Sequence, residues 1–100
     1  MYRTVLLILL SLVAATVVIS FARAETGLAS YYSGRGQGLT CAHRTRPFGS
    51  IVTVSYRTRS IQCRINDRGP FVRGRIIDLS ASAARALGMT RAGIIHVSVE

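Results

Sequence analysis

The stretch INDRGPFVRGRIIDLS, residues Ile65–Ser80, holds two of the four acidic residues of the chain, Asp67 and Asp78. It begins at the end of an apolar run, turns at Gly69-Pro70 and resumes as a second apolar run that ends at a serine. This order predicts a strand, a turn, a second strand and the start of a helix. A carboxylate on a rigid turn at a strand end can transfer protons, whereas one on an exposed helix face usually only aids solubility.

The rest of the chain after residue 24 favours short strands. We expect strands at Gly27–Tyr32, Ile51–Tyr56, Ser60–Asn66, Arg75–Leu79 and Ile94–Val99, and a hairpin link at residues 57–59. One helix is expected over Ala81–Leu87, with Ser80 as its N-cap and Gly88 as its C-terminal cap. The glycine-rich segment 33–38 lacks the flanking strand and helix of a phosphate loop, so it predicts a turn only. Five or six short strands with one helix predict a small closed β-barrel.

Residues 1–24 have the pattern of a signal peptide. Arg3 precedes the apolar run Val5–Ile19, and Ala22 and Ala24 are the small residues of a cleavage site. The run of about fifteen residues is shorter than the roughly 20 that a membrane span needs, and no cysteine stands at the cleavage point to carry a lipid. We therefore expect a Sec-type leader cleaved after Ala24, export to the periplasm or the medium, no stable membrane anchor, and one domain over residues 25–100.

All thirteen basic residues are arginine, and the chain has a net charge of +9. Arg3 and Arg23 belong to the expected leader, so eleven arginines face four acidic residues in the domain, a net charge of +7. The arginines are scattered and are not interleaved with aromatic residues, which argues against nucleic acid as the partner. Anionic polymers of the cell envelope suit an exported protein better, while a merely solvated arginine-rich surface stays open.

Cys41 and Cys63 are the only cysteines, and both lie in the expected exported domain. An oxidising compartment favours a disulfide between them, which would stabilise so small a domain by about 3 kcal/mol. A nucleophilic thiol two residues before His43 is the less favoured interpretation. Two cysteines and two histidines without paired spacing do not predict a zinc site, and we expect no metal and no cofactor.

Several segments, taken in order, resemble the rare lipoprotein A family. They are LTCAHRTRPFGS at Leu39–Ser50, NDRGPF at Asn66–Phe71 and GRIIDLS at Gly74–Ser80, preceded by ASYY at Ala29–Tyr32. The match covers nearly the whole expected domain. The resemblance implies a mainly β fold, a small six-stranded double-psi β-barrel with one short helix, which expansins and family-45 endoglucanases also have.

The family resemblance also implies an activity on peptidoglycan. Characterised members are lytic transglycosylases that cut between N-acetylmuramic acid and N-acetylglucosamine, leave a 1,6-anhydro end and prefer strands stripped of stem peptides. Matched residue by residue, the catalytic aspartate of the family is Asp67 and its active-site histidine is His43. The substrate of the family implies that this protein binds peptidoglycan glycan strands. We expect the protein to be a monomer.

One carboxyl group can carry out this reaction. Hydrolysing glycosidases commonly use two carboxylates, but here the nucleophile is the C6 hydroxyl of the sugar itself. Asp67 would donate a proton to the glycosidic oxygen and then accept the proton of that hydroxyl, while His43 orients the sugar or relays a proton. The alternative for Asp67 is a plain turn-forming residue before Arg-Gly-Pro.

The expected substrate-binding residues are Asp78, Arg68, Tyr31 and Tyr32. Asp78 stands at a strand-to-helix joint, where expansin-like barrels have a functional aspartate, but it could also bind loop amides or pair with Arg75. The two tyrosines are candidates for stacking on sugar rings. Because side chains alternate along a strand, only one of the two can face a groove.

The chain departs from the family in three places. The family carries a Thr-Ala-Ser-Gly-Glu segment whose glutamate is implicated in activity, whereas residues 33–38 contain no acid. Arg46 stands where a leucine is usual, and we expect a short form without the family's peptidoglycan-binding repeat domain. Two alternatives therefore stay open: an expansin-like module that binds or loosens wall glycan without cutting it, and an interaction domain that uses the barrel as a basic scaffold.

Overall fold

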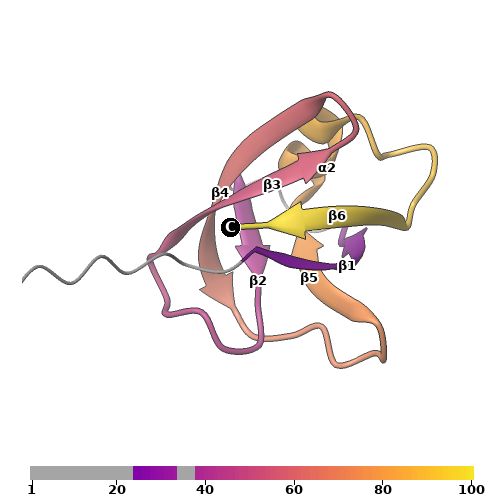
Figure 1. Ribbon diagram of the computed structural model, residues 1–100. Coiled ribbons are helices and arrows are strands. Elements are labelled where there is room, and N and C mark those ends of the chain that lie inside the picture. Colours follow the sequence, from indigo (N-terminus) through magenta and orange to yellow (C-terminus); the bar gives the residue numbers. More distant parts are fainter. Residues whose placement is uncertain (1–23, 34–37) are drawn as a thin grey trace, which may run out of the picture.

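The computed structural model describes residues 24–33 and 38–100 (Figure 1). Its elements are β1 (Glu25–Tyr31), β2 (Thr40–Ala42), β3 (Ile51–Tyr56), β4 (Arg59–Asp67), β5 (Arg75–Leu79), α2 (Ala81–Leu87) and β6 (Ile95–Val99). Residues 1–23 of the expected leader and residues 34–37 of the glycine-rich loop lie outside the described residues. None of the helices in the described ranges is long and apolar enough to cross a membrane.

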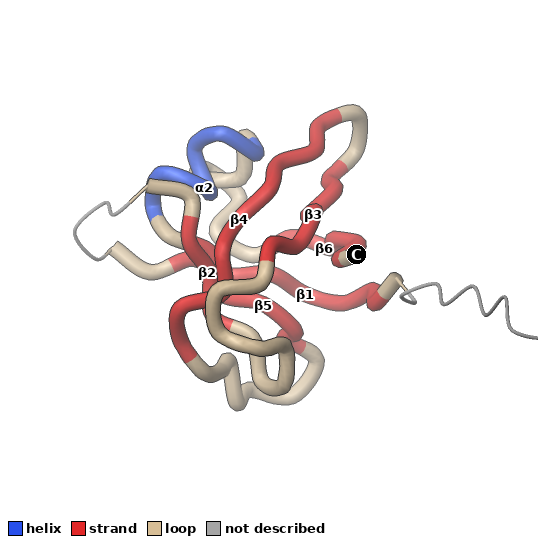
Figure 2. Tube along the Cα trace, turned by 90° about the vertical axis from the view of Figure 1, so that its left-hand side faces the viewer, coloured by secondary structure: helices blue, strands red, loops and turns tan. Residues whose placement is uncertain are grey.

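The six strands form one closed barrel in the order β1-β5-β2-β4-β3-β6, in which β6 also pairs with β1. Strand β1 runs parallel to β5, and β2 runs parallel to β4, whereas the other neighbours are antiparallel. Figure 2 shows the strands wrapping around a common interior, with the helix at one end. The expected mainly β barrel of six strands with one short helix is confirmed.

The helix α2 has the caps that the sequence predicts. The Ser80 hydroxyl accepts a hydrogen bond from the backbone N–H of Ala83 at 3.1 Å, and Gly88 ends the helix with a φ of 78°, which glycine adopts without strain. Ala83, Ala84 and Leu87 are fully buried on the side that faces the barrel. The helix therefore contributes to the same core as the strands.

The strand bounds differ from the prediction at several ends, and β2 was not expected as a strand. Its three residues are all buried, so the sequence has no alternation there to indicate a strand. The first strand begins at Glu25 and not at Gly27, and β4 runs on through Asp67. The hairpin between β3 and β4 turns on two residues, and Arg57 has a φ of 53°.

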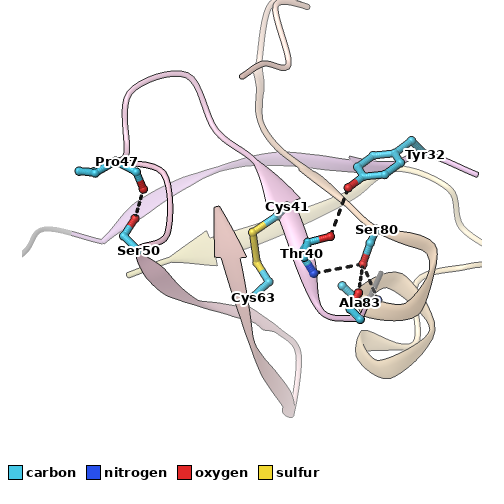
Figure 3. Close-up of a disulfide and its surroundings, with 9 residues drawn as sticks. Tyr32, Thr40, Cys41, Pro47, Ser50, Cys63, Ser80 and Ala83 are labelled. Carbon is cyan, nitrogen blue, oxygen red and sulfur yellow. Dashed lines mark hydrogen bonds between the residues drawn. A yellow bond between two sulfur atoms is a disulfide. The ribbon is translucent and has the colours of Figure 1, made fainter. Parts of the chain in front are cut away.

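Strand β2 is held from two sides. The expected disulfide between Cys41 and Cys63 is present in the core and joins β2 to β4 (Figure 3). On the other side, the Ser80 hydroxyl donates to the carbonyl of Gly38 at 2.9 Å and accepts from the N–H of Thr40 at 3.3 Å. One covalent bond and one capping serine thus fix the shortest strand.

Replacing both Cys41 and Cys63 by alanine should lower the free energy of unfolding by about 3 kcal/mol. The bond closes a loop between residues 22 apart, so its loss returns conformational entropy to the unfolded chain. Urea unfolding followed by circular dichroism measures the effect. A double variant whose unfolding midpoint equals that of the wild type would contradict a stabilising role.

Candidate active site

A row of residues crosses four neighbouring strands on the outer face of the barrel. In the strand register Ser30 lies opposite Asp78, Asp78 opposite Ala42, and Ala42 opposite Asp67. In β1, β2 and β5 the row points away from the core, because the chain neighbours Ala29, Cys41, Ile77 and Leu79 fill it. Ser30 and Ala42 are nevertheless covered, whereas Asp67, which pairs with Ala42 at a register shift, is exposed. Barrel pairing therefore brings together the two aspartates that the sequence singles out.

The two aspartates of this row differ in their surroundings. Ala42 separates them, and two strand spacings of about 4.8 Å put their backbones roughly 10 Å apart. The Asp78 carboxylate accepts a hydrogen bond from the Ser30 hydroxyl. Asp67 is exposed, and its Oδ1 accepts the backbone N–H of Arg68 at 2.8 Å. Asp67 is thus the carboxylate of the row that presents itself to solvent.

His43 is buried, with 3% of its surface exposed, and both of its ring nitrogens have partners. Nδ1 accepts the backbone N–H groups of Thr45 at 3.1 Å and Arg46 at 3.0 Å. Because Nδ1 is an acceptor, the ring proton lies on Nε2 and is donated to Glu25 Oε1 at 3.0 Å. The backbone N–H of His43 donates to the carbonyl of Asp67 at 3.1 Å, so the two predicted catalytic residues meet through the main chain.

Glu25 is the site residue that sequence reasoning missed. Its Oε1 also accepts from the Arg46 guanidinium at 3.4 Å, so one carboxylate oxygen serves a histidine and an arginine. A hollow of about 210 Å³ lies here, lined by Glu25, His43, Arg44, Thr45 and Ile76. In the sequence Glu25 is only the first residue after the expected cleavage point. Arg46 could have indicated its role, because an arginine where the family usually has leucine can pair with an acidic residue, and Glu25 is its partner.

Arg68 joins the turn after Asp67 to the loop at residues 43–48. One guanidinium nitrogen donates to the carbonyl of His43 at 3.1 Å and to that of Arg46 at 2.7 Å. The guanidinium carbon lies 4.1 Å from the centre of the Phe48 ring. The Arg68 charge is therefore engaged with this loop, and neither of the ion pairs within the described ranges involves Asp67.

The two tyrosines take different positions, as strand alternation requires. Tyr31 packs against the core, and its hydroxyl donates to the carbonyl of Thr90 at 3.0 Å. The Tyr32 hydroxyl lies 3.4 Å from Thr40 Oγ1, beside Ser80 (Figure 3). Only Tyr32, two residues after Ser30, continues the outward-facing side of β1 toward the row.

Across residues 24–33 and 38–100 there is no cluster of three or more histidine, cysteine, aspartate or glutamate side chains that could hold an ion. The chemistry that the described site offers is that of carboxylates, one imidazole and guanidinium groups.

A closed barrel of six strands with two parallel pairs defines the protein as a double-psi β-barrel. A family model described as lytic transglycolase matches residues 24–99, and the chain belongs to this family. The probable endolytic peptidoglycan transglycosylase RlpA of Nostoc sp. is 43% identical over 106 residues, covering 88% of this chain and 27% of the relative. The endolytic peptidoglycan transglycosylase RlpA of Pasteurella multocida is 44% identical over 92 residues, with coverages of 77% and 31%. The chain thus spans less than a third of either relative.

Solved structures share the fold. A Streptomyces papain inhibitor superposes with a TM-score of 0.65 at 25% identity, covering 83% of this chain and 97% of the inhibitor. An expansin from Clavibacter michiganensis, solved in complex with cellohexaose, has a TM-score of 0.66 at 24% identity, with coverages of 78% and 50%. The expansin likeness concerns the fold alone.

Replacing Arg68 by lysine should lower the free energy of unfolding by about 1 kcal/mol, because an ammonium group does not stack on the Phe48 ring as a planar guanidinium does. Urea unfolding measures the change. The control is Arg64→Lys, an exposed arginine on β4, the strand that ends just before Arg68. Equal midpoints for the two variants would show that Arg68 does not hold the loop.

Proposed function

We propose that this barrel is a peptidoglycan lytic transglycosylase. It cleaves between N-acetylmuramic acid and N-acetylglucosamine, prefers strands without stem peptides and leaves a 1,6-anhydro end. The observation that carries the proposal is the solvent-facing Asp67 carboxylate on the outer row of the barrel. Membership of the lytic transglycolase family and the names of the relatives support the same reaction.

Asp67 is the general acid and then the general base of this reaction. Its proton passes to the glycosidic oxygen as the bond from that oxygen to the anomeric carbon breaks. The C6 hydroxyl of the same muramic acid then forms the new bond to the anomeric carbon and gives its proton to the Asp67 carboxylate. The enzyme is restored, no water is consumed and no electron acceptor is needed. A lone carboxylate suffices because the nucleophile is already part of the substrate.

The other expected site residues either bind the sugar or hold the loop beside Asp67. Asp78, fixed by Ser30, offers its remaining acceptor sites to sugar hydroxyls on the far side of Ala42. Tyr32 extends this side of the row. His43 acts as a positioning residue, since its ring shapes the loop beside Asp67 and is shielded from bulk solvent. Arg68 fixes that loop and so acts on the substrate only indirectly.

Peptidoglycan lies outside the cytoplasmic membrane, so the proposal includes export. Residues 1–24 are the signal peptide, cleaved after Ala24, and residues 25–100 act as a monomer in the periplasm or outside the cell without a lasting membrane anchor. The net positive charge of the domain favours binding to an anionic wall.

A second candidate is an expansin-like module that binds or loosens wall glycan without cutting it. The observation in its favour is the absence of an acidic residue from segment 33–38, where the family has a glutamate. A third candidate, an interaction domain, has a counterpart in the papain inhibitor.

Asp67→Asn should reduce the release of anhydro-sugars from stem-free glycan by at least about 100-fold, because asparagine keeps the shape but cannot transfer the proton. Mass spectrometry of the digest measures the products. Asp78→Asn should raise KM with a smaller effect on kcat. The matched control is Glu100→Gln, an exposed carboxylate at the end of the chain, which should leave the rate unchanged.

The outcomes separate the three candidates. Absence of anhydro product from the wild-type protein overturns the transglycosylase, and unchanged product from Asp67→Asn overturns the role of that residue. Sedimentation with insoluble wall without any product favours the expansin-like module. Inhibition of papain without binding to the wall favours the interaction domain.

A further inference from the structure

Two phenylalanine side chains are exposed on the loops that meet beside Asp67. Phe48 is 61% exposed and Phe71 is 80% exposed, the largest values among the exposed large hydrophobic residues of the described chain. One ring belongs to the loop between β2 and β3, the other to the loop between β4 and β5, and both loops lie at the same end of the barrel (Figures 1 and 2). Exposed apolar side chains on neighbouring loops at one end of a fold are candidates for a binding surface.

The Phe48 side chain is held in position by Arg68 and by the loop to which it belongs. The Arg68 guanidinium stacks on its ring at 4.1 Å, while the same guanidinium donates to the carbonyls of His43 and Arg46. The His43 ring closes the turn of this loop from the other side through two backbone N–H groups. Phe48 is therefore held against Arg68, the residue that follows Asp67. Because its loop is ordered before a ligand binds, binding costs less conformational entropy.

Phe71 is also supported by the backbone beneath it. A Cβ atom added at Gly69 would lie 3.5 and 3.6 Å from two carbons of the Phe71 ring, so the ring folds back over the turn. Gly69 has a φ of 111°, a conformation that side chains rarely adopt, and both Gly69 and Pro70 are buried. The turn between Asp67 and Phe71 is thus a compact base that leaves the ring open to solvent.

We propose that Phe48 and Phe71 form a platform that binds the glycan strand by stacking against the apolar C–H faces of its sugar rings. The platform rests on the proposed function, because it would hold the strand across the Asp67 carboxylate. A pyranose ring presents hydroxyl groups around its rim and C–H bonds on its faces, so it matches an aromatic surface next to a carboxylate. The sequence names Tyr31 and Tyr32 as candidates for stacking, but Tyr31 packs against the core. Phe48 and Phe71 would take this role beside Asp67.

The choice of phenylalanine indicates what the platform recognises. Without a hydroxyl or ring nitrogen, the two side chains bind the shape of the sugar and not its substituents. Phe48 and Phe71 would therefore accept either amino sugar of the strand. The platform supplies affinity along the strand, and the carboxylates set its register.

Binding is measured apart from cleavage in the Asp67→Asn background, by sedimentation with glycan strands freed of stem peptides. Phe71→Ala should weaken this binding about tenfold, since an anchoring aromatic side chain contributes on that scale, and Phe71→Tyr should retain most of it. Phe48→Ala should weaken it similarly. The matched control is Ile94→Ala, an apolar residue 45% exposed next to β6, which should bind as the parent protein does.

Three results would overturn the platform: affinities of the Phe71→Ala and Ile94→Ala proteins that agree, no binding of the parent protein to glycan, or a dimer that Phe71→Ala converts to a monomer. Because Phe71 is exposed, its replacement should leave the urea midpoint unchanged, which separates lost binding from lost folding. Anhydro products from the proteins with Asp67 intact test the proposed function independently. Binding that depends on Phe71 without any such product keeps the platform and rejects the transglycosylase.

Discussion

The three buried residues of β2 are the constraint on which the rest of the structure depends. This strand lies between β4 and β5, so it joins the two parallel pairs of the barrel into one closed sheet. A strand of three residues makes too few ladder hydrogen bonds to hold its own register, and here a disulfide to β4 and the Ser80 hydroxyl do so. The position of Ala42 between the two aspartates follows directly from that register.

The candidate active site is likewise held in place by a small number of side chains. The His43 imidazole, the Arg68 guanidinium and the Glu25 carboxylate all help to hold one loop, while Asp67 is exposed at the end of β4. Of the four acidic residues in the domain, Glu25 thus stabilises the structure, while Asp67 is available for catalysis. Because the positioning groups are hydrogen-bonded before a ligand binds, the surface around Asp67 is preorganised.

The sequence predicted the elements whose patterns are local and missed those that only long-range pairing creates. The helix caps at Ser80 and Gly88 follow from residue chemistry at fixed offsets, and the cysteine pair follows from compartment and number. Strand β2 has no alternation because both of its faces are covered, and the contact between Glu25 and His43 joins residues 18 apart in the chain through the closure of the barrel. Motifs therefore identified Asp67, while its relation to Asp78 required the strand register.

Closure of the barrel has a consequence for how this protein meets other molecules. With each of the described strands paired on both sides, the sheet offers no free edge to which an extended peptide could add as another strand. Main-chain recognition of proteins is thereby disfavoured, and so is edge-to-edge aggregation of the folded domain. The surface instead presents side chains on loops. Such contacts suit a polymer that, unlike a peptide, has no regular row of backbone N–H and C=O groups to pair with a strand.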